Sequence, residues 1–161
     1  MREQVSVLAL LKKFSLVLLL AVFVIVSSIL SKNFLKPTNL LNMLQQCSVP
    51  GVIAIGMTIV IIIGGIDLSV GGVAALCGMI ASIIVGAGRP DAVGILAGIG
   101  VGALCGLFTG IIISRFGLPD FIVSMGTLQI ARGIALLVTR GQPVFGLPKS
   151  FSMIGGGRIA G

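Results

Sequence analysis

Long runs of uncharged, mostly apolar residues follow one another along this chain, and they constrain its fold more than any other feature. The 161-residue sequence is 57% hydrophobic and only 9% charged, whereas a soluble domain carries about 25% charged residues that keep its surface wetted. Too few charges are present to cover a water-facing surface. Because one spanning helix takes about 20 apolar residues, the sequence predicts an all-α protein, a polytopic transmembrane helical bundle with about five spans and one short amphipathic elbow helix.

Charged or turn-forming residues separate the apolar runs and set the expected boundaries. We expect a cytoplasmic N-terminal tail over 1–13, a transmembrane bundle over 14–139, and an extramembrane loop rich in Gly and Pro over 140–161, inside which the chain ends. The predicted spans are 14–31, 49–66, 68–88, 92–114 and 121–139. A cleavable signal peptide is the alternative for the first run, but that run is long and lacks an A-x-A site at its end. The pair Lys12 and Lys13 favours an amino terminus on the cytoplasmic side.

A short amphipathic helix is predicted between the first two spans, after a break at Pro37. At helical spacing, Asn42, Gln45 and Gln46 fall on one face, opposite a face of leucines. Two interpretations of this amide face stay open: an interfacial elbow before the next span, or amides that line a solute path. Pro50 is expected in the first turn of the following span, where its missing N–H costs least.

Glycine recurs at every fourth position of the fourth predicted span, at Gly94, Gly98, Gly102, Gly106 and Gly110. Residues four apart lie nearly above one another on a helix, so these glycines form a slanted groove. Small residues on a membrane helix let a neighbouring helix approach closely. The spacing therefore predicts helix packing and indicates no chemistry.

The inventory of reactive side chains argues against catalysis. The sequence has no His, and its acidic residues lie far apart. The residues that usually form acid/base pairs and nucleophilic triads are therefore missing. No GxxxxGK[ST] phosphate-binding motif is present, and an ATP-driven step would need a partner chain. Its three Cys residues stand singly, without CxxC spacing, so we expect no metal site and no cofactor in this chain. The net charge of +7 comes from cations scattered between the apolar runs, which fits lipid head groups rather than nucleic acid.

Asp67 is the charge that the apolar pattern isolates most clearly, within the segment Gly-Gly-Ile-Asp-Leu-Ser-Val-Gly-Gly at 64–72. A carboxylate at membrane depth costs about 2.5–3.5 kcal/mol on insertion scales and normally faces a partner or a watery cavity. The glycines let the helix break there, and unwound backbone is tolerated only where protein or a cavity covers it. Asp67 and Ser69 thus mark a candidate polar site on a solute path. The alternative is that Asp67 only caps the next helix by accepting backbone N–H bonds.

Arg132 is a second charge inside a predicted span. We expect it to serve as a structural anchor or to form an ion pair with Asp120 or Asp67.

Several stretches resemble the membrane permeases of bacterial ABC importers for ribose and related sugars. The most specific is the Gly-Gly-Ile-Asp-Leu-Ser-Val-Gly segment at 64–71, and the resemblance continues at 39–46, 56–58, 119–127, 131–133 and 139–143. Permeases of this family are longer, and the resemblance covers their amino-terminal half. The chain is therefore expected to derive from a truncated gene, a split gene or a partial record.

The resemblance implies a multi-pass subunit of the bacterial inner membrane that forms part of the path of a sugar. Its implied partners are a second permease copy or the complementary half, a cytoplasmic ATPase subunit, a periplasmic sugar-binding protein and the lipid bilayer. A non-transporting assembly or scaffold subunit, or a permease remnant, is the main alternative. A passive channel or secondary carrier is a third reading, since composition fits all of them.

Overall fold

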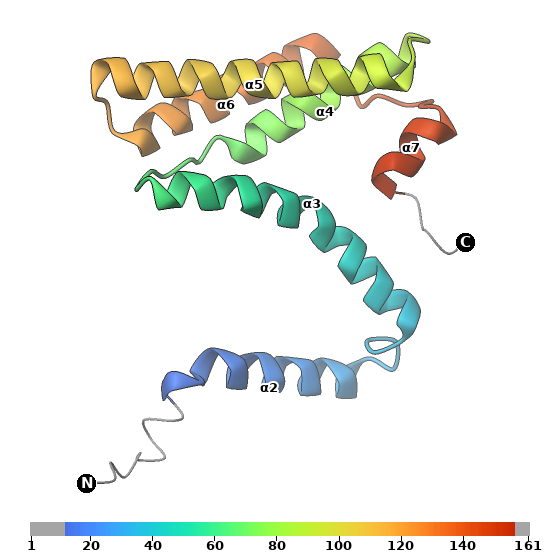
Figure 1. Cartoon of the computed structure of the whole chain (residues 1–161). Coiled ribbons are helices and arrows are strands. Elements are labelled where there is room, and N and C mark those ends of the chain that lie inside the picture. Colours follow the sequence, from blue (N-terminus) through green and yellow to red (C-terminus); the bar gives the residue numbers. More distant parts are fainter. Residues whose placement is uncertain (1–11, 157–161) are drawn as a thin grey trace, which may run out of the picture. The chain divides into compact units, whose positions relative to one another are not determined.

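The computed structural model describes residues 12–156 (Figure 1). Within that range every regular element is a helix: α2 Ser15–Leu30, α3 Pro37–Ile62, α4 Val70–Gly86, α5 Asp91–Phe116, α6 Asp120–Thr139 and α7 Lys149–Gly156. The predicted tail, apart from its last two residues, and the end of the predicted loop, 157–161, lie outside the described residues. The chain divides into two compact units, Met1–Pro50 and Gly51–Gly161, which are treated separately.

Three of the described helices, α3, α5 and α6, are long and apolar enough to cross a membrane by length and composition. Helices α2 and α4 are also apolar but shorter, with 16 and 17 residues. Each predicted span overlaps one of these helices, although the end of the second, 63–66, lies in irregular backbone, and the count of five membrane crossings stays a prediction.

The expected separate elbow helix is wrong. The elbow and the following span form one continuous 26-residue helix, α3, with Pro50 in its interior rather than in a first turn. Pro50 has no amide hydrogen to donate to the carbonyl of Gln46, so one helical hydrogen bond is missing there. Prolines inside membrane helices are tolerated because neighbouring groups satisfy the freed backbone carbonyl. In addition, the part of α3 before Pro50 contains no glycine that would end the helix.

The expected loop after α6 also contains a helix. α7 begins directly after Pro148, and the amide of Ser152 donates to the Pro148 carbonyl at 3.1 Å. Proline suits the start of a helix because the first amides have no partner inside it. The described part of the predicted loop, 140–156, is therefore irregular only up to Pro148.

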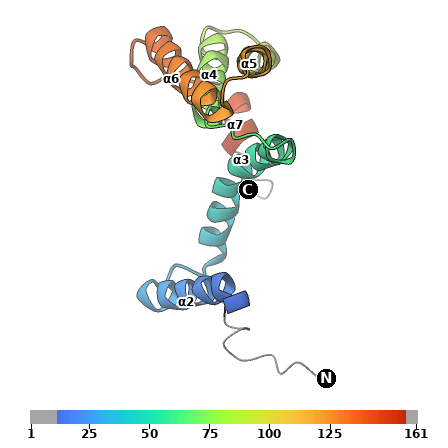
Figure 2. The ribbon, with the colours of Figure 1, turned by 90° about the vertical axis from the view of Figure 1, so that its left-hand side faces the viewer.

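Three apolar helices make the core of the unit 51–161. α4 packs against both α5 and α6, and Figure 2 shows it between them. Leu76 of α4 meets Ala131 and Ala135 of α6 in the buried cluster, and all three side chains are at most 6% exposed. Small residues on α6 keep the helices close. This three-helix core is the frame against which the irregular segment before α4 is held.

Candidate functional site

The backbone leaves helical conformation between α3 and α4, over residues 63–69, which we call the crossover. α3 ends in a Schellman turn: Gly64 has a left-handed φ of 84°, its amide bonds Ile61 O at 3.0 Å, and the Gly65 amide bonds Val60 O at 2.9 Å. A residue with a β-carbon would be strained at position 64. The turn satisfies carbonyls at the end of α3 and directs the chain into an extended segment that carries Asp67.

The Asp67 carboxylate is held by the residue that precedes α4. Its Oδ1 accepts hydrogen bonds from the backbone N–H of Ser69 at 2.7 Å and from the Ser69 hydroxyl at 2.6 Å. Ser69 is 4% exposed, and Asp67 is half-buried. The carboxylate therefore lies beside the first turn of α4, where the helix dipole stabilises negative charge. The bond to the Ser69 amide is one that the capping alternative expects, although the N-cap residue of α4 is Ser69 itself and makes no side-chain capping bond.

α6 holds the crossover from the other side through Ser124. The Leu68 amide donates to Ser124 Oγ at 3.1 Å, and Ser124 Oγ lies 3.3 Å from both Ile66 O and Phe121 O. These contacts join residues 56 and 58 positions apart in sequence. They give polar partners to two backbone groups of the crossover that have none within a helix or strand.

Two hollows meet at Asp67. The larger, of about 390 Å³, is lined by apolar side chains of α3 and α5 and by the polar residues Asp67, Thr109, Ser114, Asp120 and Ser124. The smaller, of about 250 Å³, lies between the start of α4 and α5 and also includes Asp67, Ser69 and Gly106. The larger hollow, with apolar walls and a few polar groups, has a volume at the lower end of those that bind small molecules.

Asp120 faces the larger hollow from the first turn of α6. Its carboxylate lies so close to Gly65 that a β-carbon there would be 2.8 Å from Asp120 Oδ2. Two half-buried carboxylates, Asp67 and Asp120, thus line one hollow, each beside the N-terminus of a helix. Such a lining repels anions and offers hydrogen-bond acceptors to hydroxyl groups.

The predicted site residues divide between the two units. Asp67 and Ser69 lie together at the crossover, whereas the amides belong to the first half of α3, in the unit that ends at Pro50. Asn42 and Gln45 are half-buried there and Gln46 is exposed. A joint lining by these amides and Asp67 stays a prediction.

The glycines of α5 have two different environments. Gly94, Gly98 and Gly102 lie against α4: their β-carbons would be 2.9 Å from Ala81 O, 3.1 Å from Cys77 O and 3.2 Å from Cys77 Sγ, respectively. Gly106 and Gly110 have nothing within 4 Å of that position and line the hollows, and Gly102 also lines the smaller one. The first three glycines permit close helix contact, and the last two leave space beside Asp67.

Arg132 lies on an exposed face of α6. The expected ion pair with Asp120 is wrong: Asp120 is the first residue of the same helix, and the axial rise over the intervening residues is about 18 Å. The anchoring role of Arg132 stays a prediction.

Sequence reasoning missed Ser124, Thr109 and Thr127 as polar groups of the helix core. Ser124 is 1% exposed, and the Thr109 and Thr127 hydroxyl oxygens lie 2.8 Å apart across α5 and α6. A signal was present: the buried residues Ser124, Thr127, Ala131 and Ala135 recur at three- to four-residue spacing on α6. This small and polar stripe marks the face of α6 that packs inward.

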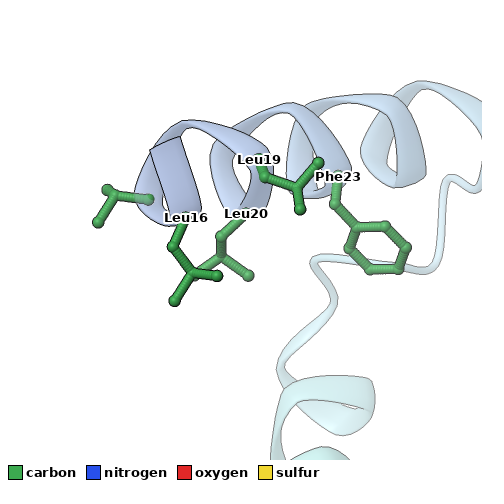
Figure 3. A pocket seen from close by; sticks show the side chains of 5 residues that line it. Leu16, Leu19, Leu20 and Phe23 are labelled. Atoms are coloured by element: carbon green, nitrogen blue, oxygen red, sulfur yellow. The ribbon is translucent and has the colours of Figure 1, made fainter. Parts of the chain in front are cut away.

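A different hollow, of about 470 Å³, lies along α2 (Figure 3). Its lining is entirely apolar and comes from one helix: Leu16, Val17, Leu19, Leu20 and Phe23. Without polar groups it offers nothing to orient a hydrophilic solute. It is the kind of surface that lipid tails or another apolar helix cover.

Known permeases share much of this sequence. The ribose import permease protein of Bacillus subtilis (strain 168) is 42% identical over 144 residues, covering 88% of this chain and 45% of that protein. The D-allose transport system permease protein of Escherichia coli (strain K12) is 34% identical over 139 residues, covering 86% and 42%, respectively. The L-arabinose ABC transporter permease protein of Azospirillum brasilense is 29% identical over 160 residues, covering 99% and 47%. The chain thus spans less than half the length of these relatives, and no solved structure matches it.

The family model described as "Branched-chain amino acid transport system / permease component" matches residues 39–156. This range contains α3 apart from its first two residues, α4 to α7, the crossover and both hollows at Asp67. The resemblance inferred from the sequence is confirmed. The chain belongs to this family of transport permeases, which includes the permeases of sugar ABC importers.

Proposed function

We propose that this chain is a permease component of an ABC importer and forms part of the path of a sugar across the bacterial inner membrane. The observation that carries the proposal is the crossover, which puts Asp67 beside two hollows of the helical unit 51–161. Irregular backbone and a carboxylate at membrane depth are costly unless they line a cavity or meet a partner. Relatives named as ribose, arabinose and allose permeases support a sugar as the solute.

The chemistry of the larger hollow suits an uncharged polyhydroxylated solute. Carboxylate oxygens of Asp67 and Asp120 accept hydrogen bonds from hydroxyl groups, while Ser114 both donates and accepts. The walls Val60, Ile63 and Ile113 are apolar, a lining that suits the carbon faces of a sugar ring. The amides Asn42, Gln45 and Gln46 of α3 are proposed as further contacts of the sugar on its path.

Transport against a gradient needs energy and partners that this chain does not supply itself. In the proposed importer, a cytoplasmic ATPase drives alternating access, a periplasmic binding protein delivers the sugar, and a second permease copy or the complementary half completes the passage. The amino terminus is on the cytoplasmic side in this arrangement, as Lys12 and Lys13 favour.

Uptake of radiolabelled ribose tests the proposal. The chain is produced in a strain without its own ribose importer, together with the complementary carboxyl-terminal half of a ribose permease, a ribose-binding protein and its ATPase. We expect ATP-dependent uptake, and we expect Asp67→Ala to lower the initial rate about tenfold or more, as the loss of a charge-assisted hydrogen bond predicts. Ser69→Ala, which removes one of the two hydrogen bonds to Asp67, is expected to have a smaller effect in the same direction.

Asp91→Ala is the matched control, because Asp91 is also a half-buried aspartate in the first turn of a helix but lines neither hollow at Asp67. It should leave uptake near the unmodified rate. Equal uptake by the Asp67 and Asp91 variants would contradict the passage role. Association with the other subunits without any uptake would favour the scaffold alternative, and uptake without ATP would favour a passive channel or secondary carrier.

A further inference from the structure

Ser124 is bound to the two peptide groups that flank Asp67. The Ile66 carbonyl belongs to the peptide before Asp67, and the Leu68 amide belongs to the peptide after it. The Ser124 hydroxyl contacts both peptides: it accepts a hydrogen bond from the Leu68 amide at 3.1 Å and donates one to the Ile66 oxygen at 3.3 Å. Because the two peptide planes on either side of a residue define its φ and ψ, this pair of contacts fixes the backbone of Asp67.

The surroundings make Ser124 a fixed support. Its side chain is 1% exposed, and it lies on α6, whose neighbour Leu128 packs against Gly72 of α4. The crossover, in contrast, belongs to no helix or strand over 65–69. A single buried hydroxyl on a packed helix therefore holds a segment that lacks regular structure of its own.

We infer that Ser124 is the positioning residue of the solute site: it holds the Asp67 backbone so that the carboxylate lies between Ser69 and the larger hollow. This inference rests on the proposed function for the role of Asp67 in uptake. It adds that the geometry of Asp67 depends on α6, and that Ser124 acts through Asp67 without touching solute itself.

The hydroxyl has one hydrogen and two possible acceptors at the same distance, Ile66 O on the crossover and Phe121 O on its own helix. Donation to Ile66 O holds both peptides around Asp67. Donation to Phe121 O leaves only the Leu68 contact.

Hydrogen exchange tests the support independently of transport. The purified chain, in detergent or lipid nanodiscs, is compared with Ser124→Ala by amide exchange. The Leu68 amide loses its acceptor, so we expect its exchange to speed up about tenfold, and the Ser69 amide, which bonds Asp67, to follow it. The Val73 amide, bonded to Ser69 O within the first turn of α4, should keep its rate.

Thr127→Val is the matched control, because Thr127 is also buried on α6 but contacts Thr109 instead of the crossover. It should leave Leu68 exchange unchanged. Ser124→Cys keeps a side chain of similar shape with weaker hydrogen bonding and should give an intermediate rate, which preserves the test if the alanine variant folds poorly. Unchanged Leu68 exchange in both Ser124 variants would overturn the inference, as would equal acceleration at Leu68 and Val73.

Ribose uptake tests whether Ser124 acts through Asp67. Ser124→Ala should raise the half-saturating ribose concentration, and combining it with Asp67→Ala should lower uptake no further than Asp67→Ala alone. Independent, multiplicative losses would contradict the positioning role. If Asp67→Ala proves harmless, the proposed passage fails at Asp67, whereas the exchange experiment still decides whether Ser124 fixes the crossover.

Discussion

Gly72 of α4 lies directly against the backbone of Leu128 on α6. A β-carbon at position 72 would stand 2.8 Å from the Leu128 carbonyl oxygen and 2.7 Å from its Cδ1. The side-chain atom can move, but the carbonyl belongs to a packed helix. We therefore expect Gly72→Ala to push α4 away from α6 and to destabilise the protein by about 1–3 kcal/mol, as overpacking does. Thermal unfolding in detergent, followed by circular dichroism, measures the change.

Gly78→Ala is the control for this prediction. Gly78 lies on the same helix, is exposed, and has nothing within 4 Å of a β-carbon. Alanine favours a helix by about 1 kcal/mol over glycine, so this variant should melt at the same temperature or higher. If the two alanine variants melt alike, the close contact at Gly72 does not limit packing.

A buried threonine pair links α5 to α6. Thr109 Oγ1 and Thr127 Oγ1 lie 2.8 Å apart, and each also lies near a carbonyl of its own helix, Cys105 O at 2.9 Å and Val123 O at 3.1 Å. Two hydroxyl hydrogens serve these three contacts, so one threonine donates across the interface while the other donates to its own helix. We expect a coupling energy of about 0.5–2 kcal/mol between the two side chains.

A double-mutant cycle with Thr109→Val and Thr127→Val measures this coupling, because valine keeps the shape and removes the hydroxyl. Either single replacement should lower the unfolding free energy, and the double replacement should cost less than the sum of the two. Thr58→Val is the control: Thr58 is exposed and donates only within α3, to Ala54 O. Strictly additive losses at positions 109 and 127 would show that the interhelical hydrogen bond contributes nothing.

The sequence predicted the helices better than it predicted their connections. Apolar runs locate α2 to α6 because each run is a local property. The continuity of α3 through Pro50 could not be read in the same way, because a proline suits both a first turn and a tolerated interior position in a membrane helix.

The candidate site was only partly predictable for a related reason. Asp67 and Ser69 are two residues apart, and a capping contact between them follows from local geometry. Ser124 binds the Leu68 amide, which lies 56 positions away in the sequence. The residue periodicity of a helix does not indicate which of its serines contacts a distant backbone amide. The glycine spacing on α5 defines a slanted groove, but the point at which α4 leaves that groove, after Gly102, depends on how the two helices cross.

Gly106 is the residue of α5 that most directly controls the space around Asp67. It lines both hollows, and nothing lies within 4 Å of where its β-carbon would be. Valine at this position fits the helix and should fill space that solute needs. We expect Gly106→Val to keep the thermal midpoint and to raise the half-saturating ribose concentration about 5- to 150-fold, the equivalent of an overpacking cost of about 1–3 kcal/mol.

Gly100→Val is the matched control on the same helix. Gly100 is exposed, has nothing within 4 Å of a β-carbon, and lines neither hollow at Asp67, so both the thermal midpoint and ribose uptake should stay unchanged. Both variants replace glycine by valine on the same helix, so they share the change in helix propensity. They differ only in where the added methyl groups point. Equal uptake by both would mean that the space beside Asp67 is not used by the sugar, whereas a lowered midpoint in Gly106→Val alone would show that the space is needed for packing instead.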